Sequence, residues 1–114
     1  MISISQRLVG QVILLDVAGR FTGGENYNAL SSKIIGLLKE GHILFVLNLG
    51  EIINADSTGI GELIMCVRRV KEKGGEIKIA NPSAKIESLL HITNLENIFE
   101  VHETERSALR SFGH

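Results

Sequence analysis

Residues 43–49 read Ile-Leu-Phe-Val-Leu-Asn-Leu, and residues 54–61 read Asn-Ala-Asp-Ser-Thr-Gly-Ile-Gly. The first stretch is a short, almost continuous apolar run with one polar interruption at Asn48. Its length is typical of a buried central strand and is short for a helix. The second stretch leads into apolar residues at helical spacing. Together the two stretches predict a buried strand, a polar loop and a helix.

The helix that follows the loop is predicted over residues 57–73. Its apolar positions recur three and four residues apart and define one buried stripe, which consists of Ile60, Leu63, Ile64, Val67 and Val70. Gly74 and Gly75 then end the helix. Before the central strand, Tyr27, Leu30, Ile34, Leu37 and Leu38 also recur at helical spacing. They predict a first helix that ends near Gly41.

Two further strands are predicted in the N-terminal segment, joined by a tight turn at Gly10-Gln11. Residues 2–8 alternate in polarity, whereas residues 12–18 are nearly all apolar. We therefore expect a half-buried and a more buried strand, paired as a hairpin. Residues 19–24 break this pattern and predict a loop. Because a helix separates residues 12–18 from residues 43–49, these two strands are expected to be parallel, with a right-handed crossover.

The C-terminal half continues the alternation of strands and helices. Its expected elements are a strand over 76–80, a turn over 81–83, a helix over 84–91, a strand over 99–102 and a helix over 103–112. Neither an internal repeat nor an interdomain linker is visible in the sequence. The predicted fold class is therefore α/β, a single domain over residues 1–114 with a mixed β-sheet flanked by α-helices.

Composition limits the classes of partner. Hydrophobic residues make up 44% of the 114 residues, enough for one core. The formal net charge of −1 gives no long-range attraction to nucleic acid or to an anionic membrane, so neither is expected as a partner. Cys66, the one cysteine, cannot form an internal disulfide. No apolar run reaches the ~20 residues that span a bilayer, and the N-terminus lacks a signal-peptide pattern, so a cytoplasmic location is expected.

The loop before the second helix holds the residues with the most chemical potential. It follows the carboxyl end of a central strand, where α/β folds commonly place functional groups. Ser57 lies at or beside the helix N-cap, and its simplest interpretation is a cap whose hydroxyl accepts a hydrogen bond from a helix N–H. Gly59 and Gly61 are expected to leave the first turn thinly covered, so that another surface can approach the backbone.

One side of the second helix is predicted to be a docking surface. At 100° per residue this side carries Ser57, Gly61, Met65, Arg68 and Glu72, and it points away from the apolar stripe. It offers a hydroxyl, a small residue, a flexible apolar residue and charges. A phosphate on Ser57 would add about −1.5 to −2 charge at pH 7. The helix N-terminus tolerates an anion, so the fold is expected to survive while the docking surface changes.

In this order the motifs resemble the STAS domain family, specifically the bacterial anti-sigma factor antagonists. The resemblance covers nearly the whole chain. It is carried by Val-Ala-Gly-Arg (17–20), the strand 43–49, Asp-Ser-Thr-Gly-Ile-Gly (56–61), Lys-Gly-Gly-Glu (73–76) and His-Ile-Thr-Asn-Leu (91–95). It implies a mixed sheet flanked by helices and a regulator that is not an enzyme.

The resemblance also implies roles for individual residues. The serine after the aspartate, here Ser57, is the one that a kinase phosphorylates, and that kinase is also the anti-sigma factor. Asp56 helps to shape the contact with the kinase. The unphosphorylated protein binds the anti-sigma factor and frees a sigma factor for transcription, the phosphorylated protein releases it, and a phosphatase resets Ser57. The predicted partner-binding residues are Thr22, Asp56, Thr58, Gly59, Gly61, Met65 and Arg68.

The sequence departs from the family pattern in two places near the expected contact. An acidic residue is common about three positions past the glycine of the loop after the second strand, where this chain has Thr22. Apolar residues often precede the aspartate, where this chain has Asn54 and Ala55. Two other functions therefore stay open, namely a STAS scaffold that is not switched and a small sensor that binds a ligand or nucleotide.

Other motifs predict neither catalysis nor a cofactor. The four histidines, at 42, 91, 102 and 114, lack metal-ligand spacing, so no metal site is expected. Ser57 lacks the Gly-x-Ser-x-Gly context of a hydrolase nucleophile, so no catalytic residue is assigned. Gly59 and Gly61 lack the third glycine and the lysine of a phosphate-binding loop.

The remaining features have simple structural interpretations. The basic residues of the second helix (Arg68, Arg69, Lys71 and Lys73) alternate with Glu62, Glu72 and Glu76, which is typical of a solvated helix face. Cys66 is interpreted as a small packing residue. Residues 23–26 form either a partner-binding loop or a flexible turn in which Asn26 caps the first helix.

Overall fold

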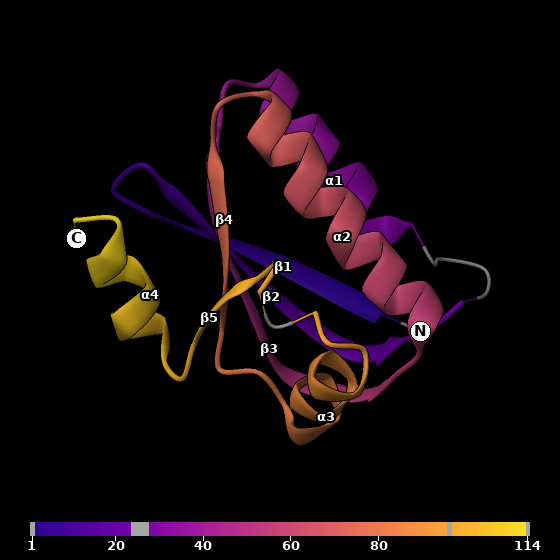
Figure 1. The fold of residues 1–114 in the computed structure, drawn as a ribbon. Coiled ribbons are helices and arrows are strands. Elements are labelled where there is room, and N and C mark those ends of the chain that lie inside the picture. The colour runs from indigo at the N-terminus through magenta and orange to yellow at the C-terminus, as the bar shows by residue number, and fades with distance from the viewer. Residues whose placement is uncertain (1, 24–27, 96, 114) are drawn as a thin grey trace.

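The computed structural model describes residues 2–23, 28–95 and 97–113. Strands and helices alternate along most of the chain (Figure 1). Their order is β1 (Ile2–Val9), β2 (Val12–Phe21), α1 (Ala29–Lys39), β3 (Leu44–Ala55), α2 (Ser57–Glu72), β4 (Glu76–Ala80), α3 (Ala84–Ile92), β5 (Glu100–His102) and α4 (Glu105–Ser111).

The five strands form one mixed sheet in the order β1-β2-β3-β4-β5. β1 and β2 are an antiparallel hairpin, in which Val9 pairs with Val12. Gly10 has a φ of 60°, a conformation that glycine adopts without strain, so the tight turn forms where the sequence predicts it. β2, β3, β4 and β5 are parallel to one another. The prediction of an α/β domain with a mixed sheet is confirmed.

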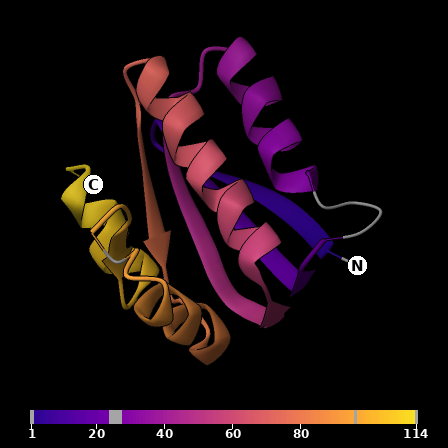
Figure 2. The same ribbon diagram turned by 45° about the vertical axis from the view of Figure 1, so that its right-hand side comes forward.

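Helices cover both faces of the sheet but unequally (Figure 2). α1, α2 and α3 lie against one face, where their apolar side chains join those of the strands in the main core (Figure 1). α4 lies on the other face and closes a smaller cluster that Val12, Leu14, Val46, Ala80 and Ala108 form. Apolar residues on both faces explain why β2 and β3 read as continuous apolar runs rather than alternating ones.

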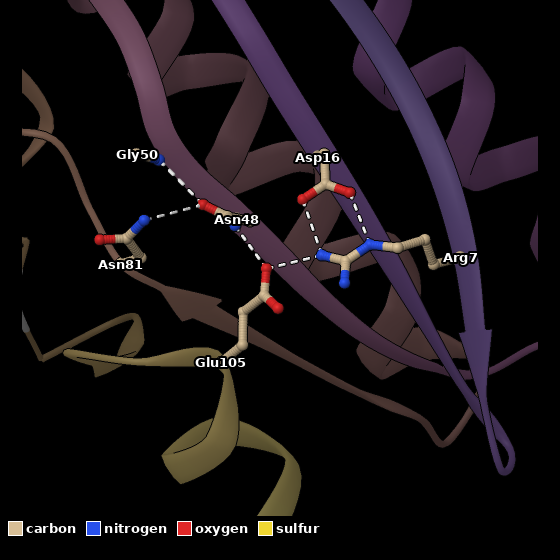
Figure 3. A network of polar contacts seen from close by, with 6 residues as sticks. All are labelled: Arg7, Asp16, Asn48, Gly50, Asn81 and Glu105. Atoms are coloured by element: carbon tan, nitrogen blue, oxygen red, sulfur yellow. Dashed lines mark hydrogen bonds and ion pairs between the residues drawn. The ribbon is translucent and has the colours of Figure 1, made fainter.

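A polar network holds α4 against the sheet (Figure 3). The Arg7 guanidinium donates to both carboxylate oxygens of Asp16 at 2.8 Å and to Glu105 Oε2 at 2.6 Å. Asn48 Nδ2 donates to the same Glu105 oxygen, and Asn48 Oδ1 accepts from the Gly50 N–H at 3.0 Å. Asn48, the polar interruption in the central strand, therefore gives β3 a polar contact with α4 in addition to the apolar packing of Val46.

Two strands are longer than the sequence predicts. β2 ends at Phe21 instead of Ala18, and β3 continues to Ala55 instead of ending at Leu49. The extra residues pair with each other, with Phe21 opposite Ala55. The apolar run that predicts β3 ends at Leu49 because the residues after it are no longer continuously apolar. In this part of β3, Ile52 is buried and Ile53 is exposed. Long-range pairing, which no local pattern records, decides where these strands end.

The other differences are small. α1 begins at Ala29, and Tyr27, where the first helix was expected to begin, lies outside the described residues. β5 and α4 are each shorter than predicted, by one residue and by three residues. None of the helices within the described residues combines the length and apolar character needed to cross a membrane.

Candidate functional site

Asp56 connects the end of β3 to the start of α2 and is the N-cap of that helix. Its backbone is extended (φ −137°), and its Oδ1 atom accepts hydrogen bonds from the N–H groups of Thr58 at 3.0 Å and Gly59 at 3.1 Å. These are two of the helix N–H groups that lack an intrahelical acceptor. The interpretation of Ser57 as the cap is therefore wrong, because the carboxylate one residue earlier performs that function.

Ser57 is the first residue of α2, and it is exposed. Within the described part of the chain, its hydroxyl makes no hydrogen bond. The side chain therefore has no structural contact that modification would break. A phosphate at this position would stand at the positive end of the α2 dipole.

Gly59 and Gly61 differ in their surroundings. A Cβ atom on Gly59 would lie 2.1 Å from the carbonyl oxygen of Phe21, whereas a Cβ on Gly61 would meet nothing within 4 Å. Gly59 is buried because the end of β2 crosses α2 there at close range. The expectation that Gly59 leaves the helix open to a partner is wrong, whereas Gly61 is exposed as predicted.

The predicted docking side of α2 faces solvent. Gly61, Met65 and Arg68 are exposed along with Ser57, and Met65 keeps 46% of its surface accessible. The exposed basic residues 68, 69, 71 and 73 form a solvated face as expected.

The loop after β2 lies beside the start of α2. A Cβ on Gly23 would lie 3.5 Å from the Thr58 side chain, and the Thr22 hydroxyl donates to the Gly23 carbonyl at 3.3 Å. Thr22 therefore lies at the same end of the domain as Asp56, Ser57 and Thr58. Residues 24–26, interpreted as either a partner loop or a capped turn, lie outside the described residues.

A groove of about 390 Å³ separates α1 from α2 next to this end. It is lined by Asn28, Ser31, Ser32, Ile35, Thr58, Gly61, Glu62 and Met65. Three of these residues, namely Thr58, Gly61 and Met65, were predicted as partner contacts from the sequence. The groove is therefore continuous with the exposed side of α2 that carries Ser57.

Glu62 is buried, although its sequence context predicts an exposed position. It was assigned to the solvated face, but only 7% of it is exposed, and its Oε2 atom accepts the Ser31 N–H at 2.9 Å. Asn28, the N-cap residue of α1, makes no side-chain cap, so Glu62 provides one from the neighbouring helix. The sequence contains one signal that Glu62 is buried. Glu62 lies four residues before Cys66 and eight before Val70, so it shares a side of the helix with these two fully buried residues.

Burial sets the ionisation of two groups on α2. It raises the pKa of Glu62 above its ordinary value, against the effect of the hydrogen bonds from α1. It also raises the pKa of the Cys66 thiol to about 12, with a contribution from the Glu62 charge. A thiol with that pKa is protonated at neutral pH, which supports the interpretation of Cys66 as a packing residue. Among the described residues, no three potential ligands come together as a metal site.

The sequence matches a known family and its named members. The sequence profile of the STAS domain matches residues 4–108. The anti-sigma-B factor antagonist of Bacillus subtilis is 31% identical over 91 residues, which are 78% of this chain and 80% of that relative. A candidate anti-sigma factor antagonist of Thermotoga neapolitana is 29% identical over 72 residues, 63% of this chain. That match spans 64% of the relative's length.

Solved structures share the fold. A candidate anti-sigma factor antagonist of Thermotoga maritima has a TM-score of 0.88 at 21% identity, over 97% of this chain and 95% of that one. SpoIIAA gives TM-scores of 0.70 unphosphorylated and 0.73 phosphorylated, at 16% and 17% identity. Each SpoIIAA match covers 96% of this chain, with 97% and 99% of SpoIIAA. The profile match over most of the chain and the 31% identical relative show that this protein belongs to the STAS domain family.

Proposed function

We propose that this protein is an anti-sigma factor antagonist that phosphorylation of Ser57 switches off. In its unphosphorylated form it binds an anti-sigma factor that is also a serine kinase, and it thereby frees a sigma factor for transcription. Phosphorylation by that kinase releases the protein, and a phosphatase acting on Ser57 resets it. The protein acts in the cytoplasm by binding rather than by catalysis, without nucleic acid or membrane as partners.

The observation that carries this proposal is the division of roles between Asp56 and Ser57. Asp56 caps α2, so the helix does not depend on the Ser57 hydroxyl. Ser57 is exposed at the start of a rigid helix, beside an apolar and partly charged surface. A kinase can therefore reach the hydroxyl, and a phosphate added there changes the surface without removing a contact from the fold.

The energetic consequence for a partner is large. A phosphate that a docked surface leaves without a compensating donor loses its hydration, which costs several kcal/mol. Each ~1.4 kcal/mol corresponds to a tenfold change in affinity. A phosphate on one exposed serine would therefore lower the affinity for the partner by more than tenfold, which is how we expect it to release the partner.

The relatives support the same assignment. The 31% identical Bacillus subtilis protein is named as an antagonist of an anti-sigma factor, and SpoIIAA is known in a phosphorylated form. In this chain the Asp-Ser-Thr-Gly sequence occupies the junction of β3 and α2. The departure at Thr22 is next to Gly23, where a Cβ would lie 3.5 Å from the Thr58 side chain, so it would affect which kinase binds if the partner docks at this end of the domain.

Mass spectrometry of the intact protein, with site mapping, tests this function in native cells under two growth conditions. We expect one phosphate on Ser57 in one condition, its absence in a Ser57→Ala strain, and its persistence in a control that replaces an exposed serine of α3, Ser88→Ala. Ser57→Asp should lose binding to the kinase while its melting temperature stays within a few degrees of the parent. Absence of phosphate in every condition, or a phosphate on Thr58, would overturn the proposal in favour of a scaffold or a ligand sensor.

A further inference from the structure

Glu62 is a buried carboxylate that has no cationic partner among the residues that the structure describes. Its Oε2 atom accepts the Ser31 N–H at 2.9 Å, so the start of α1 holds part of its charge. Within the described ranges, no lysine or arginine forms an ion pair with it. Charged side chains that are this deeply buried are normally paired, because loss of hydration is costly. The increased pKa of Glu62 reflects the same deficit.

Glu62 lines the groove between α1 and α2, so a group that enters the groove can reach it. Ile35 of α1 and Met65 of α2 give the groove two apolar sides, and the Glu62 carboxylate gives it a negative one. A lysine or arginine side chain matches this combination, since its methylene groups pack on apolar surface while its cationic end pairs with a carboxylate. A volume of about 390 Å³ accommodates one such side chain.

The groove and the predicted docking surface are one continuous region. Thr58, Gly61 and Met65 line the groove and also border the exposed side of α2 that begins at Ser57. A partner that covers Ser57 therefore also covers the mouth of the groove. Charge complementarity favours a basic side chain of that partner over an apolar one, which would leave the carboxylate buried without a countercharge.

We propose that the groove between α1 and α2 binds a lysine or arginine side chain of the anti-sigma factor, and that Glu62 recognises its charge. This inference rests on the proposed function and extends it, because it names the chemistry that selects the partner. Phosphorylation of Ser57 then controls whether the partner can dock, and Glu62 contributes to which partner docks.

The test compares Glu62→Gln with Glu40→Gln. Glutamine removes the charge and retains one oxygen that can accept the Ser31 N–H, although its NH2 group cannot accept the further hydrogen bonds that Glu62 takes from Ser31 and Leu30. Glu40, the C-cap residue of α1, is exposed, carries the same charge and lies at the opposite end of α1 from Ser31, which makes it a control outside the docking surface. The partner is the kinase purified from the source cells by its ability to phosphorylate Ser57, and the affinity is measured by calorimetry at low and high salt.

We expect Glu62→Gln to weaken binding of the kinase by about tenfold or more and to reduce the salt dependence. Glu40→Gln should bind within about twofold of the parent, as expected for an exposed charge outside the docking surface. If Glu62→Gln binds as tightly as the parent while Ser57→Asp still abolishes binding, this inference is wrong and the proposed function stands. If the parent does not bind the kinase at all, both are wrong.

A second measurement uses the unaltered protein, so it does not depend on how Glu62→Gln folds. The carboxyl ¹³C resonance of Glu62 is titrated with and without the kinase. A cation in the groove stabilises the ionised carboxylate, so we expect the pKa of Glu62 to fall when the kinase binds. A pKa that is unchanged or higher in the complex would overturn the inference even if the affinity of Glu62→Gln were reduced.

Discussion

At the scale of single residues, Asp56 and Ser57 divide stability and regulation between them. Replacing Asp56 with alanine leaves the Thr58 and Gly59 N–H groups without their acceptor. We expect Asp56→Ala to lower the free energy of unfolding by about 1 kcal/mol, within the 0.5–2 kcal/mol range of lost N-caps. Ser57→Ala removes no hydrogen bond and should change it by less than about 0.5 kcal/mol. Urea denaturation measures both, and equal losses would contradict the assignment of the cap to Asp56.

The two glycines at the start of α2 provide a second pair of residues with opposite expectations. A methyl group at Gly59 would overlap the Phe21 backbone, so we expect Gly59→Ala to cost about 1–3 kcal/mol, as overpacked positions do. The control is Gly61→Ala, where a Cβ has open space. Alanine there should increase stability by up to about 1 kcal/mol because it has the higher helix propensity. Thermal and urea unfolding of both variants test the prediction, and a stabilised Gly59→Ala would show that β2 and α2 are not in contact there.

Glu62 links the stability of the fold to pH. Its folded pKa lies above its ordinary value of 4.5, so the folded state retains this proton more strongly than the unfolded chain does. The parent therefore loses stability as the pH rises from about 4.5 through the folded pKa, relative to Glu62→Gln, which has no proton to lose. We expect Glu62→Gln to be at least as stable as the parent at pH 7, with a difference that grows over this window and is then constant.

Urea unfolding between pH 4.5 and 8 measures this difference, with Glu72→Gln as the variant whose difference should stay flat. A Glu62→Gln protein less stable than the parent at pH 7 would mean that α1 requires a charged cap. A stabilised variant that binds its partner less well is the combination expected of a residue retained for recognition.

At the scale of elements, α4 is held by polar contacts as well as by its small apolar cluster. Glu105 accepts from Arg7 and Asn48, and Lys78 donates to Ser111 Oγ at 2.6 Å. The buried Lys78 ammonium also lies 3.1 Å from a Glu100 carboxylate oxygen and 4.1 Å from the centre of the Phe112 ring. These contacts fix a seven-residue helix that is too short to be stable alone.

Glu105→Ala tests the contribution of the network in Figure 3. The substitution leaves the partly buried Asn48 amide and the Arg7 guanidinium without one acceptor each, so we expect a loss of about 1–3 kcal/mol. Hydrogen exchange should increase in α4 more than in α1 or α2. Glu103→Ala removes an exposed carboxylate near the same helix end and is the control. Equal effects of the two substitutions would show that the helix dipole, rather than the network, holds α4.

The pKa of Glu100, at the edge of the sheet, is lower than its ordinary value. The hydrogen bond with His102 is the largest cause, and the nearby Lys78 lowers the pKa further. Glu100 therefore contributes stability above its ordinary pKa of 4.5 that is lost as the pH falls through its lower folded pKa. This direction is opposite to that of Glu62. The two carboxylates therefore contribute to the stability of the fold with opposite dependence on pH.

At the scale of the whole molecule, the two cores are expected to unfold together. The main core and the α4 cluster lie on opposite faces of the same strands, with Phe45 and Leu47 on one side of β3 and Val46 on the other. Loss of either core therefore exposes a face of β3. We expect one cooperative transition over residues 1–114, with far-UV circular dichroism and NMR giving the same midpoint in urea. Two separate transitions would contradict the prediction that these residues form a single domain.

Local patterns were sufficient for the order and type of the elements. The apolar run over 43–49 and the stripe through Ile60 and Leu63 each produce the element that their period predicts, because burial of one face requires that period. Strand ends were less predictable, since the extensions to Phe21 and Ala55 exist because they pair with each other. For the same reason the segment expected as a loop before α2 is mostly strand.

The sequence by itself determined the mixed α/β fold, the helix that begins at Ser57 and the exposed side of that helix. These follow from the spacing of residues that are neighbours along the chain. Only the tertiary structure decided that Asp56 is the cap, that Gly59 lies under Phe21 and that Glu62 is buried against Ser31. Each of these depends on backbone geometry or on the close approach of segments that are separate in the sequence. Hydrogen bonding and burial depend on distances in space, and the order of residues along the chain does not give those distances.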